Sequence, residues 1–352
     1  MSTDDTSAQH GGWLPQLAGP ATAGAPDAGP VANGPVGPAA TGPAAAEVAN
    51  GPAAAGPVTA VRPRFRWRDE RLPAPANPVP GWLRFLNSEL RLVFGRPRNQ
   101  ALLGVLAIVP VFLGILLRLT IGASGGPGGP PFLNQLAGNG VFLALVVLTL
   151  TLTVLLLPLS VGVVSGDAIA GEAGLGTLRG LLTVPSGRTR LLAVKYAAIV
   201  VFSLTACLVV SVISLIMGFI LFHVGSVTLL SGTTVSLGSG VLRVLTVAVF
   251  AAAAMASLGA IGLAASTLTQ HPVGAIAGVL VLTVASEICD QLPQLSAIHS
   301  YLPTHYWLSW DGLFRSPVDW SGIEYGLVSY AVYAVIFGAI AWARLTSADI
   351  TS

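Results

Sequence analysis

Long, uninterrupted apolar segments are the feature that most constrains how this chain can fold. A helix needs roughly 20 consecutive apolar residues to cross about 30 Å of hydrocarbon. Segments of that length recur from residue 101 onward, and only 9% of the 352 residues are charged whereas 53% are hydrophobic. Because hydrocarbon offers no water to the backbone, such segments satisfy their own hydrogen bonds as helices. The sequence therefore predicts an all-α membrane protein.

Six of these segments are predicted to be transmembrane helices. They cover about residues 101–119, 141–164, 191–222, 241–268, 273–288 and 325–343. Proline removes a backbone hydrogen bond inside a helix, so Pro110 is expected to bend the first one. Arg118, Arg243 and Glu287 all lie near span ends, where long side chains can reach the interface. Because no span centre carries a charge, a pump with a charged relay is not indicated.

The distribution of basic residues predicts the orientation. Nine arginines precede the first span, whereas the connections around 121–140 and 224–240 contain neither Lys nor Arg. Basic residues also surround the connection between the second and third spans, namely Arg179, Arg188, Arg190 and Lys195. Since Lys and Arg are enriched in cytoplasmic loops, we expect both termini and residues 165–195 in the cytoplasm.

The first 80 residues are rich in Pro, Gly and Ala, with repeated Gly-Pro steps. Such a composition cannot bury a core, so residues 1–80 are predicted to be a disordered cytoplasmic tail. Asp4 and Asp5 argue against a signal peptide, which needs a basic region followed by an apolar one. The arginines from Arg62 to Arg71 either attract an anionic inner leaflet or only flank the first span, and both interpretations stay open.

Residues 81–98 are predicted to form an amphipathic helix in the membrane interface. From Trp82 to Phe94, apolar side chains cover one broad arc and polar side chains cover the other. Glu89 intrudes on the apolar arc. Residues 99–345 then hold the six spans, and residues 346–352 form a short cytoplasmic tail.

Residues 165–195 are the main polar interruption between two apolar segments. On a helix with 100° per residue, one narrow face carries Glu172, Arg179 and Thr183. The opposite face carries Leu175, Leu178 and Leu182. Pro185 is expected to end this helix. An amphipathic helix between two spans either lies flat on the bilayer or offers its polar face to a partner.

The connection at residues 291–324 is the longest one predicted outside the membrane. It holds several aromatic residues: Tyr301, Tyr306, Trp307, Trp310 and Trp320. Trp and Tyr favour the boundary between membrane and water. The connection is therefore either a re-entrant segment that dips into the outer leaflet between the fifth and sixth spans or an ordinary interfacial loop.

Motifs for catalysis or for cofactor binding are missing. A phosphate-binding loop needs Gly-Lys before Ser or Thr, but the only lysine, Lys195, follows Val194. The histidines lack the spacing of zinc ligands on a helix, and a net charge of +2 does not suggest a nucleic-acid partner. Cys207 and Cys289 fall in apolar segments, as buried hydrophobic residues do. No catalytic residue, metal or cofactor is predicted, and the chain is not expected to be an enzyme.

The polar interruption carries a pattern of an acidic residue, a Glu, a Gly-Thr-Leu, a Leu-Leu, a Pro, a basic residue and a Lys. The residues are Asp167, Ile169-Ala170-Gly171-Glu172, Gly176-Thr177-Leu178, Leu181-Leu182, Pro185, Arg188 and Lys195. This pattern resembles the permeases of the ABC-2 family, the membrane subunits of ATP-binding-cassette exporters. The resemblance covers about residues 82–343 and implies that 99–345 are a permease domain and 172–184 a cytoplasmic coupling helix. Gly174, Gly176 and Gly180 depart from the stiff helix that this role favours.

The resemblance also implies partners and a site. A permease of this family forms a dimer, with an identical copy or a paralogue, and pairs in the lipid bilayer with cytoplasmic ATP-binding-cassette ATPase subunits. The residues implied in coupling to the ATPase are Asp167, Glu172, Thr177, Leu178, Arg179, Leu182, Pro185 and Arg188. The implied activity is export across a bacterial cytoplasmic membrane, of a substrate that the sequence does not specify.

Two other classes of function compete with this one. A secondary carrier or channel would work without any ATPase, and it is the main alternative. An intramembrane enzyme would need polar groups that face each other inside the spans, and the uncharged span centres do not favour it.

Overall fold

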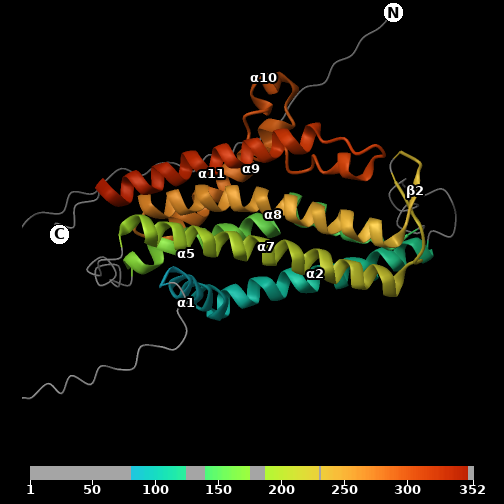
Figure 1. Ribbon diagram of the computed structural model, residues 1–352, viewed down its shortest axis with the longest axis horizontal. Coiled ribbons are helices and arrows are strands. Elements are labelled where there is room, and N and C mark those ends of the chain that lie inside the picture. The colour runs from blue at the N-terminus through green and yellow to red at the C-terminus, as the bar shows by residue number, and fades with distance from the viewer. Residues whose placement is uncertain (1–80, 124–138, 175–186, 230, 348–352) are drawn as a thin grey trace, which may run out of the picture. The chain divides into compact units, whose positions relative to one another are not determined.

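The computed structural model describes residues 81–123, 139–174, 187–229 and 231–347. The predicted tail at 1–80, residues 175–184 of the expected coupling helix and the residues beyond 347 lie outside them. The described chain consists of helices that run alongside one another, apart from one small pair of strands (Figure 1). The prediction of an all-helical fold is confirmed.

Five of the described helices are long and apolar enough to cross a membrane, and a bent pair of helices brings the number to six if the pair is one span. The five are α2 (Pro97–Ala123), α7 (Arg188–Leu221), α8 (Leu237–Leu268), α9 (Pro272–Asp290) and α11 (Ser321–Ser347). They coincide with the first, third, fourth, fifth and sixth predicted spans. The expected bend at Pro110 inside α2 stays a prediction.

The second predicted span, residues 141–164, is not one continuous helix. The structure divides it into α4 (Val141–Thr153) and α5 (Leu156–Gly174), which meet at an angle of 54°. Pro158 explains the break, because a proline cannot donate to the carbonyl four residues earlier, here Val154, and its ring clashes with that carbonyl. Leu155 takes up the change of direction with a φ of 64°.

The helix after this break is also longer than predicted. The sequence places the end of the apolar span at residue 164, yet α5 continues to Gly174. Ser165 and Asp167, the first polar residues of the interruption, therefore lie inside a packed helix and are buried. The polar segment begins as part of the bundle and not as a separate helix on its surface.

Helix α8 is the centre of the bundle. About 78% of its most apolar stretch is buried, against 17% for α2 and for α11. It contacts α5, α7, α9 and α11. Small residues allow this close packing: a Cβ at Gly259 would collide with Ile199 of α7, and one at Gly262 would collide with Ser165 of α5. The core is therefore built around one helix that has neighbours on most sides.

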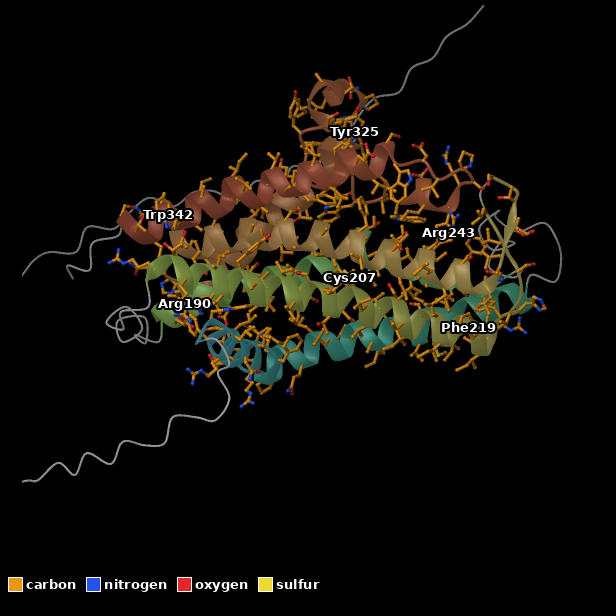
Figure 2. All side chains as sticks on the ribbon, in the orientation of Figure 1. Arg190, Cys207, Phe219, Arg243, Tyr325 and Trp342 are labelled. Atoms are coloured by element: carbon orange, nitrogen blue, oxygen red, sulfur yellow. The ribbon has the colours of Figure 1, made fainter. Side chains whose placement is uncertain are left out.

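The two ends of the bundle differ. Figure 2 labels Arg190 and Trp342 towards one end and Phe219 and Arg243 towards the other. At the second end a short antiparallel ribbon, β1 (Val227–Thr228) and β2 (Thr234–Val235), joins α7 to α8 and pairs Val227 with Val235. The sequence did not predict this ribbon.

The connection between α9 and α11 folds onto the helices. It contains the short helices η1 (Pro293–Leu295), α10 (Ser296–His299) and η2 (Asp311–Phe314). Trp307 and Phe314 are buried, and Ser286 of α9 shares a hydrogen bond of 2.7 Å with Thr304. This packing explains why the segment is so apolar, while its depth in the bilayer stays a prediction.

Candidate functional site

The candidate site lies at the end of the bundle where the polar segment leaves α5 and enters α7. Four elements meet there: α1 (Gly81–Gly95), the start of α2, the end of α5 and the start of α7 (Figure 1). Helix α1 matches the amphipathic helix predicted at 81–98, except that the chain turns at Arg96 and α2 begins at Pro97. Its location in the membrane interface stays a prediction.

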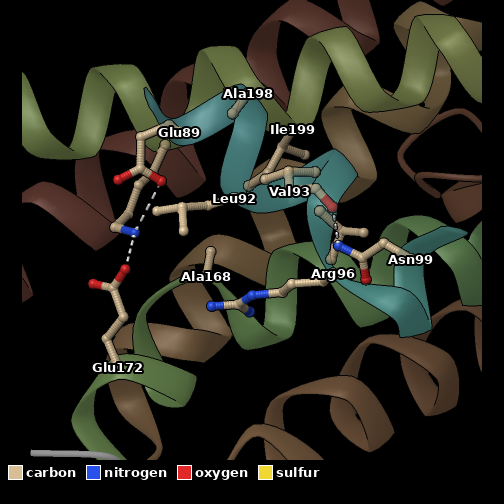
Figure 3. Close-up of a pocket in the computed structure, with 11 residues that line it drawn as sticks. Glu89, Leu92, Val93, Arg96, Asn99, Ala168, Glu172, Ala198 and Ile199 are labelled. Atoms are coloured by element: carbon tan, nitrogen blue, oxygen red, sulfur yellow. Dashed lines mark hydrogen bonds and ion pairs between the residues drawn. The ribbon is translucent and has the colours of Figure 1, made fainter. Parts of the chain in front are cut away.

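A buried lysine joins two glutamates at this end. The Nζ of Lys195 lies 2.6 Å from Oε1 of Glu172 and 3.4 Å from Oε2 of Glu89 (Figure 3). Lys195 is 4% exposed and Glu89 6%. Charges removed from water are stable only when they are paired, which is why these three side chains converge. Through Lys195, α7 is held to both α1 and α5.

A second ion-pair group ties the corner between α1 and α2 to α5. Asp167 of α5 accepts a hydrogen bond from Arg96, and its Oδ2 also lies 3.0 Å from an Nη of Arg98. Asp167 is 8% exposed, whereas both arginines reach solvent. The carboxylate is thus the buried partner, and the two arginines reach it from the start of α2.

The two groups lie next to each other, since Arg96 lines the same small cavity as Glu89, Glu172 and Lys195. Their six residues are called the "basal network": Glu89, Arg96, Arg98, Asp167, Glu172 and Lys195. Three carboxylates face three basic side chains. The cavity beside them has a volume of about 30 Å³, which is large enough for a water molecule. Asn99 lines this cavity; its side-chain nitrogen donates to the carbonyl of Val93 (2.8 Å), and its Oδ1 accepts no hydrogen bond from a described residue.

Ser266 connects the basal network to the central helix. Its Oγ accepts from the backbone nitrogens of Ile169 (3.0 Å) and Ala170 (2.8 Å) and donates to the carbonyl of Gly166 (2.8 Å). These backbone groups belong to the stretch of α5 from Gly166 to Ala170, which contains Asp167 and directly precedes the turn with Glu172. A movement of this stretch therefore reaches α8 through direct hydrogen bonds.

The structure brings only some of the predicted coupling residues together. Asp167 and Glu172 both belong to the basal network, and Glu172 directs Oε1 towards Lys195. Arg188 lies elsewhere: it donates to the carbonyls of Leu345 (3.1 Å) and Thr346 (3.0 Å) at the end of α11. The remaining predicted residues, Thr177, Leu178, Arg179, Leu182 and Pro185, lie outside the described residues, so their roles stay predictions.

Sequence reasoning missed four residues of the site. Glu89 stood out only as an irregularity on the apolar arc of α1, and Arg96 and Arg98 counted only among the basic residues before the first span. Lys195 counted towards orientation and towards the family pattern, but it was not predicted as a site residue. One signal could have identified Glu89: a lone acid on an otherwise apolar helix face is costly to bury unless a base meets it. The nearest basic residue on another helix could not be named without the fold.

The described residues offer no centre for metal chemistry. No group of three or more His, Cys, Asp or Glu side chains in this part of the chain could hold a metal ion. The basal network instead joins four elements around the ends of one connecting segment. Its chemistry suits mechanical linkage, since paired buried charges favour one relative position of the helices.

One comparison with known proteins bears on this arrangement. A family model described as "ABC-2 family transporter protein" matches residues 101–286, which is more than half of the 352-residue chain. The match runs from α2 into α9 and includes the α5 and α7 parts of the basal network. Comparison with curated protein sequences finds no match.

Proposed function

Because the chain belongs to the ABC-2 family of transporter proteins, we propose that it is the permease subunit of an exporter driven by a separate cytoplasmic ATPase. The chain is a multi-pass membrane protein, and permeases of this family generally pair with an ATP-binding subunit. In this proposal two permease copies, or one copy and a paralogue, form the pathway. The ATPase binds at the end of the bundle that holds the basal network.

The Glu172–Lys195 ion pair is the observation that carries this proposal. It joins the end of α5 to the start of α7, the two helices that residues 175–186 connect in the sequence. Glu89 of α1 pairs with the same lysine, and Ser266 of α8 forms a hydrogen bond to the backbone of α5. A partner that pushes on 175–186 therefore moves several helices together, as a rigid-body transition requires.

The proposed cycle follows from this linkage. ATP binding closes the ATPase dimer, and the docked segments 175–186 of the two permeases follow it. Since α5, α7 and α1 share the basal network, they tilt as a unit and exchange an inward-open for an outward-open state. The ATPase supplies the energy, and this chain supplies the helices that transmit the movement and the transport pathway.

The test is purification of the tagged full-length chain from its native membrane, with identification of bound proteins and an ATPase assay. We expect an ATP-binding-cassette ATPase with the unaltered chain. Arg179→Glu reverses a charge on the predicted docking face outside the basal network, and we expect roughly tenfold less ATPase to be recovered, which corresponds to about 1.4 kcal/mol. Arg344→Glu is the matched control: it makes the same change at an exposed position of α11 and should retain the ATPase.

Two results would contradict the proposal. Equal ATPase recovery with Arg179→Glu would place docking elsewhere. Recovery of the permease alone, together with solute transport that needs no ATP, would instead favour the secondary carrier.

A further inference from the structure

An apolar groove runs between α7, α8 and α11 near the end that holds the basal network. It encloses about 270 Å³. Thr189 and Tyr196 line it from α7, Ala260 and Leu263 from α8, and Gly338 and Trp342 from α11. None of these residues belongs to the basal network, so the groove is a separate feature of the bundle.

Small residues keep the groove open. A Cβ built on Gly338 would find no atom within 4 Å, so the missing side chain leaves real space. Polar groups along the groove already have partners: Nε1 of Trp342 donates to Oγ1 of Thr189 (3.0 Å), and the hydroxyl of Tyr196 donates to the carbonyl of Ala256 (3.3 Å). The remaining surface is hydrocarbon, so the groove suits an apolar chain and not a polar solute.

The narrowness of the groove favours a thin occupant. Its open space of about 270 Å³ lies along the stretch from Thr189 to Tyr196, which rises about 10 Å along α7. A single extended acyl chain can lie in such a groove, whereas a helix of about 10 Å diameter is broader. An acyl chain is therefore the occupant that the groove favours, and contact between copies is an outcome of the test below.

Charge at the end of the groove indicates which lipid fits. Arg188 binds the carbonyls of Leu345 and Thr346, which places its guanidinium next to the turn of α11 that carries Trp342. Arg344 is exposed in the same turn. Tryptophan marks the membrane interface, and arginine recognises phosphate through several donors. The groove thus has an apolar interior and a basic rim beside an interfacial aromatic residue.

We propose that this groove binds one acyl chain of an anionic phospholipid, with the phosphate against Arg188 and Trp342 at the level of the headgroup. The site goes beyond the proposed transport function and needs no ATPase. The orientation proposed above places it in the inner leaflet. A bound chain would fill the space between α7 and α11 and hold the last span against the helix that carries Lys195.

The test uses the full-length chain purified alone in detergent, so its outcome is separate from that of the ATPase experiment. Native mass spectrometry counts bound lipid, and the melting temperature is measured with added phosphatidylglycerol or phosphatidylcholine. We expect one tightly bound phosphatidylglycerol and a larger rise in melting temperature with phosphatidylglycerol than with phosphatidylcholine.

Gly338→Leu fills the groove and should abolish the bound lipid and the rise in melting temperature. Gly104→Leu is the matched control, because Gly104 of α2 also has no atom within 4 Å of an added Cβ, and it should behave like the unaltered chain. If Gly338→Leu does not fold, Ala193→Leu fills the same groove from α7. Arg188→Gln should remove the preference for phosphatidylglycerol while retaining the response to phosphatidylcholine.

Three outcomes would overturn the proposal. Unchanged lipid retention in both filling variants would show that the lipid binds elsewhere. Equal responses to the two lipids in the unaltered chain would remove the role of Arg188. A change in oligomeric state with Gly338→Leu would assign the groove to contact between copies.

Discussion

At the scale of single residues, Lys195 decides how the base of the bundle is held together. One ammonium group serves two carboxylates from different helices, and it is 4% exposed. Removing one partner of a buried ion pair leaves an uncompensated charge and costs about 3–5 kcal/mol. Replacing all partners by neutral groups of similar size is often close to neutral. The fold and the coupling function can therefore be separated by mutation.

We expect Lys195→Met to lower the free energy of unfolding by about 3–5 kcal/mol, because the buried Glu89 and the half-buried Glu172 lose the base that they share. The triple variant Lys195→Met, Glu89→Gln and Glu172→Gln should recover most of this loss. Thermal unfolding of the detergent-purified protein, followed by tryptophan fluorescence, measures both variants. Arg84→Met, at an exposed position of α1, provides the control. A single Lys195→Met variant as stable as the unaltered chain would show that the pair does not hold the helices.

The triple variant also tests coupling. If the basal network transmits movement, restored stability should come without restored ATPase stimulation, since the neutral side chains no longer favour one arrangement of α1, α5 and α7. Full stimulation by a stable triple variant would assign the coupling to packing alone.

At the scale of elements, the break between α4 and α5 shows how one proline can reshape a span. Pro158 lies in the first turn of α5. Because proline has no N–H, it cannot donate the helical hydrogen bond to the carbonyl of Val154. Leu155 then adopts a φ of 64°, a left-handed conformation that β-branched residues tolerate poorly. With the resulting angle of 54° between α4 and α5, α5 packs against α8 and α9. Asp167 then lies at the end of the bundle that holds the basal network.

We expect Leu155→Ile to reduce the free energy of unfolding by about 1–2 kcal/mol, although it conserves size and apolarity, because a branched Cβ disfavours the left-handed conformation. Leu150→Ile, within α4, is the control and should change stability much less. Both are measured by thermal unfolding in the same detergent. Equal effects at the two positions would mean that Leu155 contributes through packing and not through its backbone conformation.

At the scale of the whole molecule, the two ends of the bundle carry different chemistry. The basal network, Arg188 and Arg344 gather at one end, while the ribbon of β1 and β2 closes the other. The positive-inside rule predicts that the first end faces the cytoplasm. The proposed ATPase site and the proposed lipid site both depend on this orientation for their location in the cell.

Single-cysteine labelling tests the orientation in intact cells. In a Cys289→Ala background, where the remaining Cys207 is buried, we expect Thr233→Cys in the ribbon to react with a membrane-impermeant maleimide. Ser347→Cys at the end of α11 should react only after the membrane is permeabilised. Both positions are exposed, so access is set by the side of the membrane. The reverse labelling pattern would invert the topology and move the proposed docking end outside the cell.

The sequence alone was sufficient for the class of the fold and for five of the spans as continuous helices. Hydropathy is a local sum: each residue adds its own transfer free energy, so residues 241–268 could be recognised as a span without knowledge of their neighbours. The motif from Asp167 to Lys195 is also a local feature of the sequence, and it indicated the ABC-2 family. The match of the family model over residues 101–286 confirms that resemblance. Pro158 was also visible, but its consequence depended on how the helix could bend.

Which charged residues pair with one another was decided only by the tertiary structure. Lys195 lies 106 residues from Glu89, and Arg96 lies 71 residues from Asp167, so no periodicity within one helix could have joined them. The same holds for the groove, whose walls come from three helices and whose lining includes the small residues Ala193, Ala260 and Gly338. Whether a charge is buried, and whether a groove stays empty, depends on how the helices pack. Both are determined by the atoms of other segments that lie next to the residue in the folded chain.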